Sequence, residues 1–380
     1  MGTSSTLLPV FGAAAGAMLQ VLLIGAVGFV CAKRPKDPGP LLSPEALRHI
    51  ARLANDVFLP FLAAAVLGAR INVANMQGDW VLIPAGFFVT FLGYAIADVT
   101  ALVFRPAPEL RPALRVAIAH PNAFAMPLLL LTYLCERPAV KDEFSGDADK
   151  CVADAAAKLC LYLVAWYVVF WTYGYGVLEE AGGRPPRSFE AKCKRLFLEN
   201  NMIGMYAGIV IGATPLRRLL FRGTSFLRPV GLAIQTLGDP VIAVTVLIMA
   251  ASLINGVTRR RKEASSRSLS TLPDEGSGEA AAPRRDVATI AWFILGRLVI
   301  MPAICYPLVQ FLSLPGGQMT KLIILMELAM PSAQTVLVTL NAVGSGRVAE
   351  NIAPIYFSQY FVSLFSLTAF TAWALLIVYR

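Results

Sequence analysis

The chain has 380 residues, of which 57% are hydrophobic and only 15% are charged, and its net charge is +9. Soluble domains are about half apolar and about a quarter charged, so this composition indicates a membrane protein with several spans. The basic residues are scattered in short loops, which argues against nucleic-acid binding and instead favours cytoplasmic loops that face anionic membrane lipids.

Ten apolar runs are long enough to cross a bilayer, because about 20 helical residues span about 30 Å of hydrocarbon. The predicted fold is therefore an all-α polytopic membrane protein with ten transmembrane helices. The runs are 8–32, 47–67, 80–104, 114–134, 156–178, 202–214, 229–254, 287–312, 322–343 and 352–378. In the short sixth run, glycine recurs at Gly204, Gly208 and Gly212, which predicts a helix face that packs closely on a neighbour.

The loops predict an orientation. With the N-terminus outside, most Lys and Arg residues fall in the inner loops, as cytoplasmic loops require. The acid-rich loop 136–158 fits the outer side, whereas the arginine-rich loop 217–228 departs from the rule. Because ten is even, both termini are predicted to be non-cytoplasmic. Cys135 and Cys151 flank the acidic loop and could pair if it faces an oxidising compartment.

Two segments outside the runs complete the predicted organisation. Residues 179–201 are expected to form a cytoplasmic loop between two halves, 1–178 and 202–378. The second half is interrupted at 255–286, where a basic cluster is followed by Ser, Gly, Glu and Pro. Such a composition cannot bury a core, so this stretch is predicted to be a disordered cytoplasmic linker.

Prolines interrupt corresponding runs in the two halves. Pro121 and Pro127 lie within the fourth run, and Pro331 lies within the ninth. A proline inside a helix removes a backbone donor and clashes with the preceding turn, so both runs should be broken. Each is the fourth of five, and an odd number of spans places the halves in opposite orientation. Inverted repeats with matching broken helices are typical of secondary transporters.

The breaks are the predicted binding site. Free backbone groups cost several kcal/mol each in lipid unless they lie within protein or line a cavity. Two half-helix N-termini that face one point favour an anion such as a carboxylate. The alternative is that the polar side chains here only cap the broken helices. The candidate substrate-binding residues are Pro121, Asn122, Pro127, Pro331, Ser332 and Gln334.

Charged residues inside the runs form a second candidate set, because a charge within a span is costly and marks a site or a buried pair. Glu327 lies one turn before Pro331, and Arg297 lies in the middle of the eighth run. One interpretation pairs Arg297 with Glu327 or Asp239 as a structural bridge. The other makes Glu327 a proton-coupling group. Asp56 belongs to the same set, although it lies near the end of its run and could face water.

Motifs for other chemistry are absent from the sequence. It contains no Gly-x-Ser-x-Gly, no CxxC pair and no glycine-rich phosphate loop, and two histidines exclude a His-rich metal centre. His120, beside the first break, is expected to be a packed hydrogen-bonding residue or, alternatively, a titrating one. We therefore predict neither an enzyme nor a bound metal or cofactor.

The motifs, taken in order, resemble those of the auxin efflux carriers, and most closely the PIN-likes branch. The clearest match is NAFAMPL at 122–128. The others are FLP at 58–60, GIVIGATPLR at 208–217, RLVIMP at 297–302 and MPSA at 330–333.

The resemblance implies two inverted five-helix repeats whose broken helices, four and nine, cross. It also implies an elevator-type mechanism, often in a homodimer, and export of an amphipathic organic acid, typically indole-3-acetate. Asn122, Pro127 and Pro331 would bind the carboxylate, and the membrane would be that of the endoplasmic reticulum or the cell surface.

Two departures from the family pattern matter. Ala125 stands where the family often has a second asparagine, which argues against auxin itself, and the longest loop follows the seventh run instead of the fifth. The expected partners are a small organic anion and membrane lipids. The alternatives are a sodium- or proton-coupled organic-anion symporter of the bile-acid type, and a membrane receptor or scaffold that does not transport.

Overall fold

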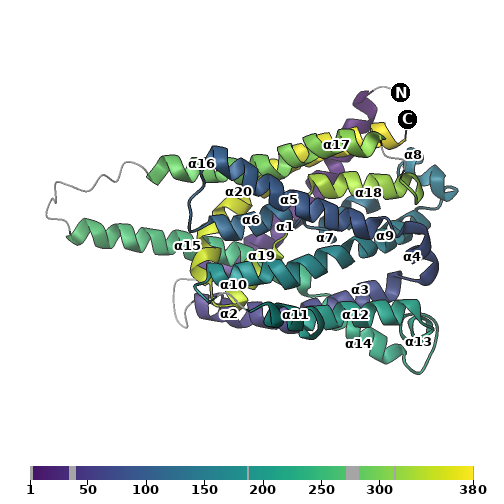
Figure 1. Ribbon diagram of the computed structural model, residues 1–380, viewed down its shortest axis with the longest axis horizontal. Coiled ribbons are helices and arrows are strands. Elements are labelled where there is room, and N and C mark those ends of the chain that lie inside the picture. The colour runs from purple at the N-terminus through teal and green to yellow at the C-terminus, as the bar shows by residue number, and fades with distance from the viewer. Residues whose placement is uncertain (1–2, 34–39, 186–187, 271–281, 312–313, 380) are drawn as a thin grey trace.

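The computed structural model describes residues 3–33, 40–185, 188–270, 282–311 and 314–379. Within these ranges the regular elements are helices, and they run roughly along the long axis of the molecule with both termini at the same end (Figure 1). In chain order they are α1 (Thr3–Lys33), α2 (Pro44–Leu53), η1 (Ala54–Phe58), α3 (Leu59–Arg70), α4 (Val73–Asp79), α5 (Leu82–Phe104), α6 (Arg111–Ala119), α7 (Ala125–Leu134), α8 (Pro138–Lys141), η2 (Asp142–Phe144), α9 (Ala148–Val169), η3 (Phe170–Gly174), α10 (Tyr175–Ala181), α11 (Phe189–Leu198), α12 (Asn200–Ala213), α13 (Leu216–Phe221), α14 (Arg228–Gly238), α15 (Val241–Ser270), α16 (Ala282–Leu295), η4 (Gly296–Ile300), α17 (Met301–Phe311), α18 (Gly317–Ala329), α19 (Thr335–Ala342) and α20 (Gly346–Val378).

The all-helical prediction is confirmed for the part of the chain that the structure describes. Six helical stretches there are long and apolar enough to cross a membrane. They are Pro44–Arg70, Leu82–Phe104, Ala148–Ala181, Arg228–Arg259, Val287–Phe311 and Gly346–Val378. Two shorter apolar helices are Leu19–Lys33 and Ala125–Leu134. The count of ten spans and the inverted repeat stay predictions.

The fourth and ninth runs are broken at their prolines. In the fourth, α6 ends at Ala119 and α7 begins at Ala125; in the ninth, α18 ends at Ala329 and α19 begins at Thr335. Pro121 and Pro331 lie within the breaks, where the chain is extended. Pro127 instead lies in the first turn of α7, where a missing N–H removes no helical hydrogen bond.

The glycine face of the sixth run packs closely, as predicted. A β-carbon added at Gly208 would lie 2.8 Å from the Leu67 Cβ atom, and one at Gly212 would lie 2.7 Å from the Ile71 carbonyl oxygen. Gly204 meets the backbone of Pro60 in the same way. The absence of side chains at these three glycines therefore lets the α12 backbone lie directly against α3.

The start of α12 also completes a distorted turn in the second run. Pro60 lies in the first turn of α3, directly after the π-helix η1, and supplies no N–H to the preceding turn. The side chain of Asn201 donates to the Asn55 carbonyl at 3.0 Å, and that of Asn200 donates to the Asp56 carbonyl at 3.4 Å. These amides supply the donors that the distorted turn lacks.

The structure describes helix on both flanks of the predicted linker 255–286. Helix α15 continues to Ser270 and α16 begins at Ala282, and residues 271–281 lie outside the described part. The start of this segment is held by its neighbours. Arg259 pairs with Glu350 at 2.9 Å, and the Asn255 amide donates to the Leu42 carbonyl at 3.3 Å. The segment 179–201 also contains a helix, α11.

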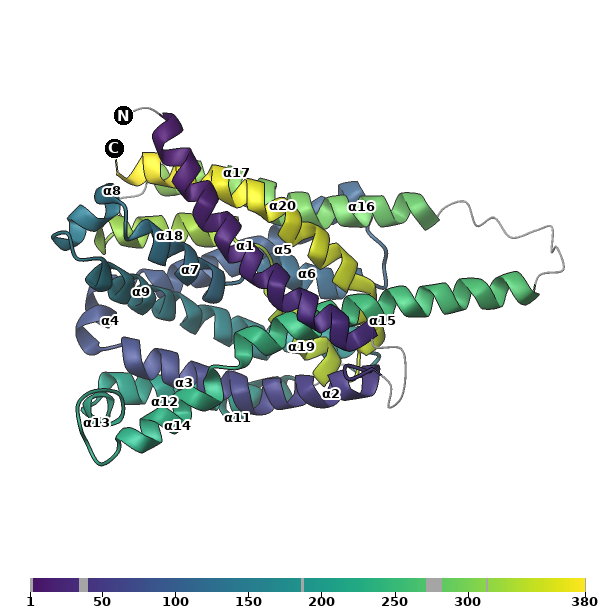
Figure 2. The same ribbon diagram turned by 180° about the vertical axis from the view of Figure 1, so that it is seen from behind.

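The acidic loop carries a disulfide. Cys135 and Cys151 are bonded, with their Cα atoms 5.7 Å apart. The loop lies at the end of the molecule that carries both termini (Figure 2). The Asp147 side chain caps α9 by accepting from the Lys150 N–H at 3.1 Å. This hydrogen bond holds the pKa of Asp147 below its ordinary value.

Candidate substrate site at the paired helix breaks

The two breaks lie side by side as a short antiparallel bridge between Pro121 and Ser332. The Asn122 N–H donates to the Pro331 carbonyl at 2.8 Å, and the Ala333 N–H donates to the His120 carbonyl at 2.9 Å. Two segments that are distant in the sequence thus satisfy each other's backbone groups, which the broken helices cannot do alone.

Helix α20 satisfies most of the remaining backbone groups of the second break. The hydroxyl of Tyr360 donates to the Ser332 carbonyl at 3.0 Å, and that of Tyr356 donates to the Ala333 carbonyl at 3.2 Å. The Gln359 side-chain oxygen accepts from the Ser332 N–H at 2.9 Å. The Tyr360 hydroxyl also accepts from the Asn122 amide at 3.3 Å, which links the two breaks. A Gln–Tyr pair in the middle of an apolar run was the available sequence signal for this role.

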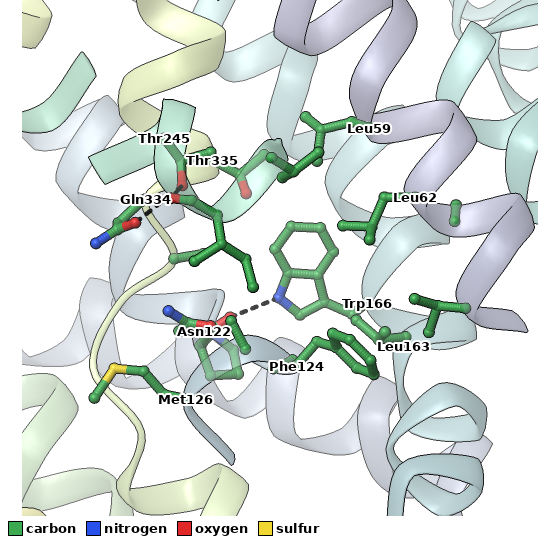
Figure 3. A pocket seen from close by; sticks show the side chains of 18 of the residues that line it. Leu59, Leu62, Asn122, Phe124, Met126, Leu163, Trp166, Thr245, Gln334 and Thr335 are labelled. Atoms are coloured by element: carbon green, nitrogen blue, oxygen red, sulfur yellow. Dashed lines mark hydrogen bonds between the residues drawn. The ribbon is translucent and has the colours of Figure 1, made fainter. Parts of the chain in front are cut away.

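Helix α9 holds the first break. The indole N–H of Trp166 donates to the Pro121 carbonyl at 2.9 Å, and its ring extends into the space between the break and α3 (Figure 3). His120 is fully buried, with its Nδ1 atom 2.9 Å from the Val116 carbonyl oxygen and its ring edge-on to those of Trp166 and Phe170. These contacts fit the expected packed histidine. Sequence reasoning missed Trp166, because a lone tryptophan in an apolar run carries no signal.

Arg297 is fully buried and joins the C-terminal ends of both interrupted helices. Its guanidinium donates to the carbonyls of Met330 at 2.8 Å, Glu327 at 2.6 Å and Ile118 at 3.5 Å. The predicted bridge to a carboxylate of Glu327 or Asp239 is therefore wrong. The reason is that the last carbonyls of α6 and α18 have no helical partner, and a cation is favourable at a helix C-terminus.

The carboxyl groups of the second candidate set are not brought together. Glu327 is completely buried, and neither side-chain oxygen has a hydrogen-bond partner within the described residues. Asp239, at the junction of α14 and α15, is exposed. Asp56 is also exposed and accepts from the neighbouring Asn55 amide at 2.9 Å, which fits a residue that faces water.

A small cavity of about 110 Å³ lies against the paired breaks, as Figure 3 shows. Asn122 and Gln334 contribute polar groups, and the Gln334 side-chain oxygen accepts from Thr245 at 3.2 Å. Ala125 also lines the cavity, in place of a second polar side chain. None of the lining residues is charged. Apolar walls come from α1, α3, α7, α9 and α15, among them Val21, Leu59, Leu62, Phe124, Met126 and Trp166.

Two helices, α7 and α19, start at this cavity. Neither α7 nor α19 has a side chain that caps its first turn. The N-terminal N–H groups of a helix carry a partial positive charge that favours an anion. Of the predicted residues, the structure thus places Asn122, Gln334 and Pro121 at the cavity, while Ser332 is buried in the bridge behind it.

Six apolar helices long enough to span a bilayer, together with two apolar runs that are interrupted beside one small cavity, are features of a multi-pass membrane transporter. A family model described as "Membrane transport protein" matches residues 13–192 and 184–371, which is nearly the whole chain. The chain therefore belongs to this family, that of the PIN and PIN-like auxin efflux carriers.

Two curated relatives come from Arabidopsis thaliana. The chain is 22% identical to Protein PIN-LIKES 3 over 293 residues, which cover 66% of this chain and 73% of the relative. It is 25% identical to Protein PIN-LIKES 4 over 163 residues, which cover 43% of this chain and 38% of that relative.

Proposed function

We propose that this transporter exports an auxin-like amphipathic organic acid anion, which binds at the crossing of the two broken helices. The observation that carries the proposal is that α7 and α19 both begin, uncapped, at one uncharged cavity. The helix ends would attract the carboxylate, and the amides of Asn122 and Gln334 would orient it. The proposed substrate-binding residues remain Asn122, Pro121, Pro127, Pro331, Ser332 and Gln334.

The walls of the cavity support an apolar body on the substrate. Phe124, Met126 and Trp166 surround the space next to Asn122 (Figure 3). The cavity volume of about 110 Å³ is below the roughly 300–1,000 Å³ of sites that hold drug-sized ligands. The proposal therefore requires the helices around the breaks to move apart before such an anion binds.

An elevator-type movement would provide that separation. In the proposal, α1, α2, α3, α12, α14 and α15 form the fixed part, and the broken helices move with the remaining spans. A contact that such a movement must break is the hydrogen bond at 3.2 Å from the Arg52 side chain in α2 to the Ala342 carbonyl at the end of α19. Arg52→Ala removes this bond and should favour the conformation in which α19 has moved away from α2. Cysteine pairs introduced across α2 and α19 should then cross-link less than in the natural protein.

Proton coupling is the second candidate, and the buried carboxyl of Glu327 is the specific observation that favours it. An ionised carboxylate without hydrogen bonds is costly to bury, so a change of conformation that exposes this group would change its protonation. If Glu327 couples transport, uptake should respond to a pH gradient in the natural protein and not in Glu327→Gln. Equal responses in both proteins would exclude this role.

The proposed orientation places both termini and the disulfide on the non-cytoplasmic side of the endoplasmic reticulum or cell-surface membrane. The support is that the Cys135–Cys151 bond requires an oxidising compartment and that the loop lies at the end with the termini. An N-glycosylation sequon inserted into loop 136–150 should be modified in cells, whereas one inserted after Arg347 should not. The reverse result would invert the assigned topology.

The decisive experiment is uptake of radiolabelled organic anions, beginning with indole-3-acetate, into proteoliposomes that contain the purified full chain. Asn122→Ala should abolish saturable uptake. Ser358→Ala is the matched control, because the hydrogen bond of the Ser358 hydroxyl among the described residues stays within its own helix, to the Pro354 carbonyl at 3.0 Å. Failure to transport any anion of the panel would refute the function, and uptake unchanged by Asn122→Ala would refute the site.

A further inference from the structure

A second and larger cavity lies on the other side of Tyr360. Its volume is about 580 Å³, and α1, α15 and α20 form its walls. These three helices cross on one face of the molecule (Figure 2). The lining includes Gly25, Phe29, Met249 and Phe361, and its one hydroxyl belongs to Tyr360, which is bonded to the break. The cavity itself therefore presents almost no polar group to an occupant.

Two glycines of α1 explain why the space exists. At Gly28 the helices α1 and α15 touch, because an added β-carbon would lie 3.2 Å from the Leu247 carbonyl oxygen. One turn earlier, at Gly25, the nearest atom is the Val246 Cγ1 at 4.0 Å. The two helices thus diverge from Gly28 toward Gly25, and the missing side chain at Gly25 leaves the gap unfilled.

The cavity is continuous with the lipid-facing surface. Several of its lining residues are themselves exposed, including Leu22 at 43%, Phe29 at 41% and Phe361 at 62%. In a multi-pass membrane protein, exposed apolar side chains on spanning helices contact acyl chains. The cavity is therefore open to the hydrocarbon of the bilayer.

We propose that this cavity binds an acyl chain of a bilayer lipid. An apolar space with no polar partners excludes water, and an empty one loses the dispersion contacts of its walls. The neighbouring phase is hydrocarbon, so an acyl chain can enter without leaving an apolar environment. The volume of about 580 Å³ also lies within the roughly 300–1,000 Å³ of sites that enclose whole small ligands.

The position of the bound chain gives it access to the substrate site. One surface of the Tyr360 ring lines the cavity, and its hydroxyl contacts Asn122 and the Ser332 carbonyl. A lipid chain in the cavity would thus pack against the residue that joins the two breaks. The binding proposal itself does not rest on the identity of the transported anion, and its test needs no transport.

The test is photolabelling of the full chain in phosphatidylcholine vesicles that contain a phosphatidylcholine with a diazirine in one acyl chain. Labelled positions are mapped by peptide mass spectrometry. Met249 is 4% exposed and Tyr360 is 2% exposed, so label on them requires a chain inside the cavity. Leu102 and Val103, at 72% and 77% exposed, report ordinary lipid contact.

Filling the cavity provides the matched comparison. Gly25→Phe should remove the label from Met249 and Tyr360 and leave that on Leu102 unchanged. Gly25→Leu, a smaller change, serves if the first variant does not elute as a monodisperse protein. Gly12→Phe adds the same ring to an exposed position of α1 with no atom within 4 Å of the new β-carbon, and it should label like the natural protein.

Label confined to exposed residues in the natural protein would overturn the proposal. Label at Met249 that persists in a folded Gly25→Phe variant would do so as well. Protection of the whole α1–α20 face, with cross-linked dimers, would show that a second copy of the chain covers the cavity instead.

Discussion

The bond between Tyr360 and the second break gives the sharpest test of how the crossing is held. Tyr360→Phe keeps the ring and removes only the hydroxyl, so it opens no cavity. The Ser332 carbonyl then loses a donor at 3.0 Å, and the Asn122 amide loses a weaker contact at 3.3 Å. Leaving a buried carbonyl unpaired costs about 1–3 kcal/mol, and the longer contact adds little.

We expect this cost to appear in both stability and substrate affinity. The paired breaks should open more readily, and the freed Asn122 amide should lose its fixed orientation. A loss of about 1–2 kcal/mol corresponds to a roughly 5- to 30-fold change in an equilibrium constant. The KM for organic-anion uptake into proteoliposomes should rise by about this factor, and the Tm in detergent should fall.

Tyr356→Phe is the matched control. It removes the same group from the same helix, where the hydroxyl donates to the Ala333 carbonyl at 3.2 Å without contacting Asn122. Both variants should lower the Tm by similar amounts, whereas Tyr360→Phe alone should raise the KM strongly. Equal KM values for the two variants would refute a role for the Tyr360–Asn122 contact in binding.

Three further predictions concern the scaffold. Gly208→Leu should lower the Tm strongly, because the β-carbon of the new leucine would lie 2.8 Å from the Leu67 β-carbon and overpacking costs about 1–3 kcal/mol or more. An unchanged Tm would contradict the close packing of α12 on α3. Replacing Cys135 and Cys151 by serine should cost roughly 3 kcal/mol, as for a closed loop of about 15 residues, and reductant should no longer change the Tm of that variant. The pKa of Asp147 is lowered in the folded protein, so its ionised form stabilises the fold at neutral pH, and this contribution is lost as the pH falls from 3.8 through the lowered pKa. Below neutral pH, the Tm of Asp147→Asn should therefore change less with pH than the Tm of the natural protein. Identical dependences of Tm on pH in the two proteins would exclude this contribution.

The places where the helices break could be predicted because the effect of proline is local. Pro121 and Pro331 remove donors from their own turns whatever surrounds them, and the structure breaks there. From the sequence, the two breaks were predicted only to lie close together, with the N-termini of their half-helices facing one point. Its register, with Asn122 opposite Pro331 and Ala333 opposite His120, depends on how two distant segments are presented, and no local pattern contains that information.

The start of the predicted linker shows the opposite case, because its tertiary contacts cannot be inferred from local composition. Residues 259–262 are basic and are followed by serine and glycine, which favours disorder in isolation. At the start of α20, Glu350 forms an ion pair with Arg259 at 2.9 Å, and the Asn351 side-chain oxygen accepts a hydrogen bond from the same guanidinium at 2.7 Å. Helix α15 continues past these contacts to Ser270. The partners of Arg259 lie about ninety residues away in the sequence, so no local pattern reveals these contacts.

Arg297 explains why a count of charges was the wrong guide to the site. Sequence reasoning matched the buried cation with a buried carboxylate, because an unpaired charge in a membrane is costly. Each broken helix, however, also creates carbonyl groups at its C-terminal end that lack helical donors. A guanidinium has five N–H donors, so one arginine can satisfy the ends of α6 and α18 together. The same arrangement leaves the Glu327 carboxyl without a partner, which is why that group, and not the arginine, is the candidate for taking up a proton.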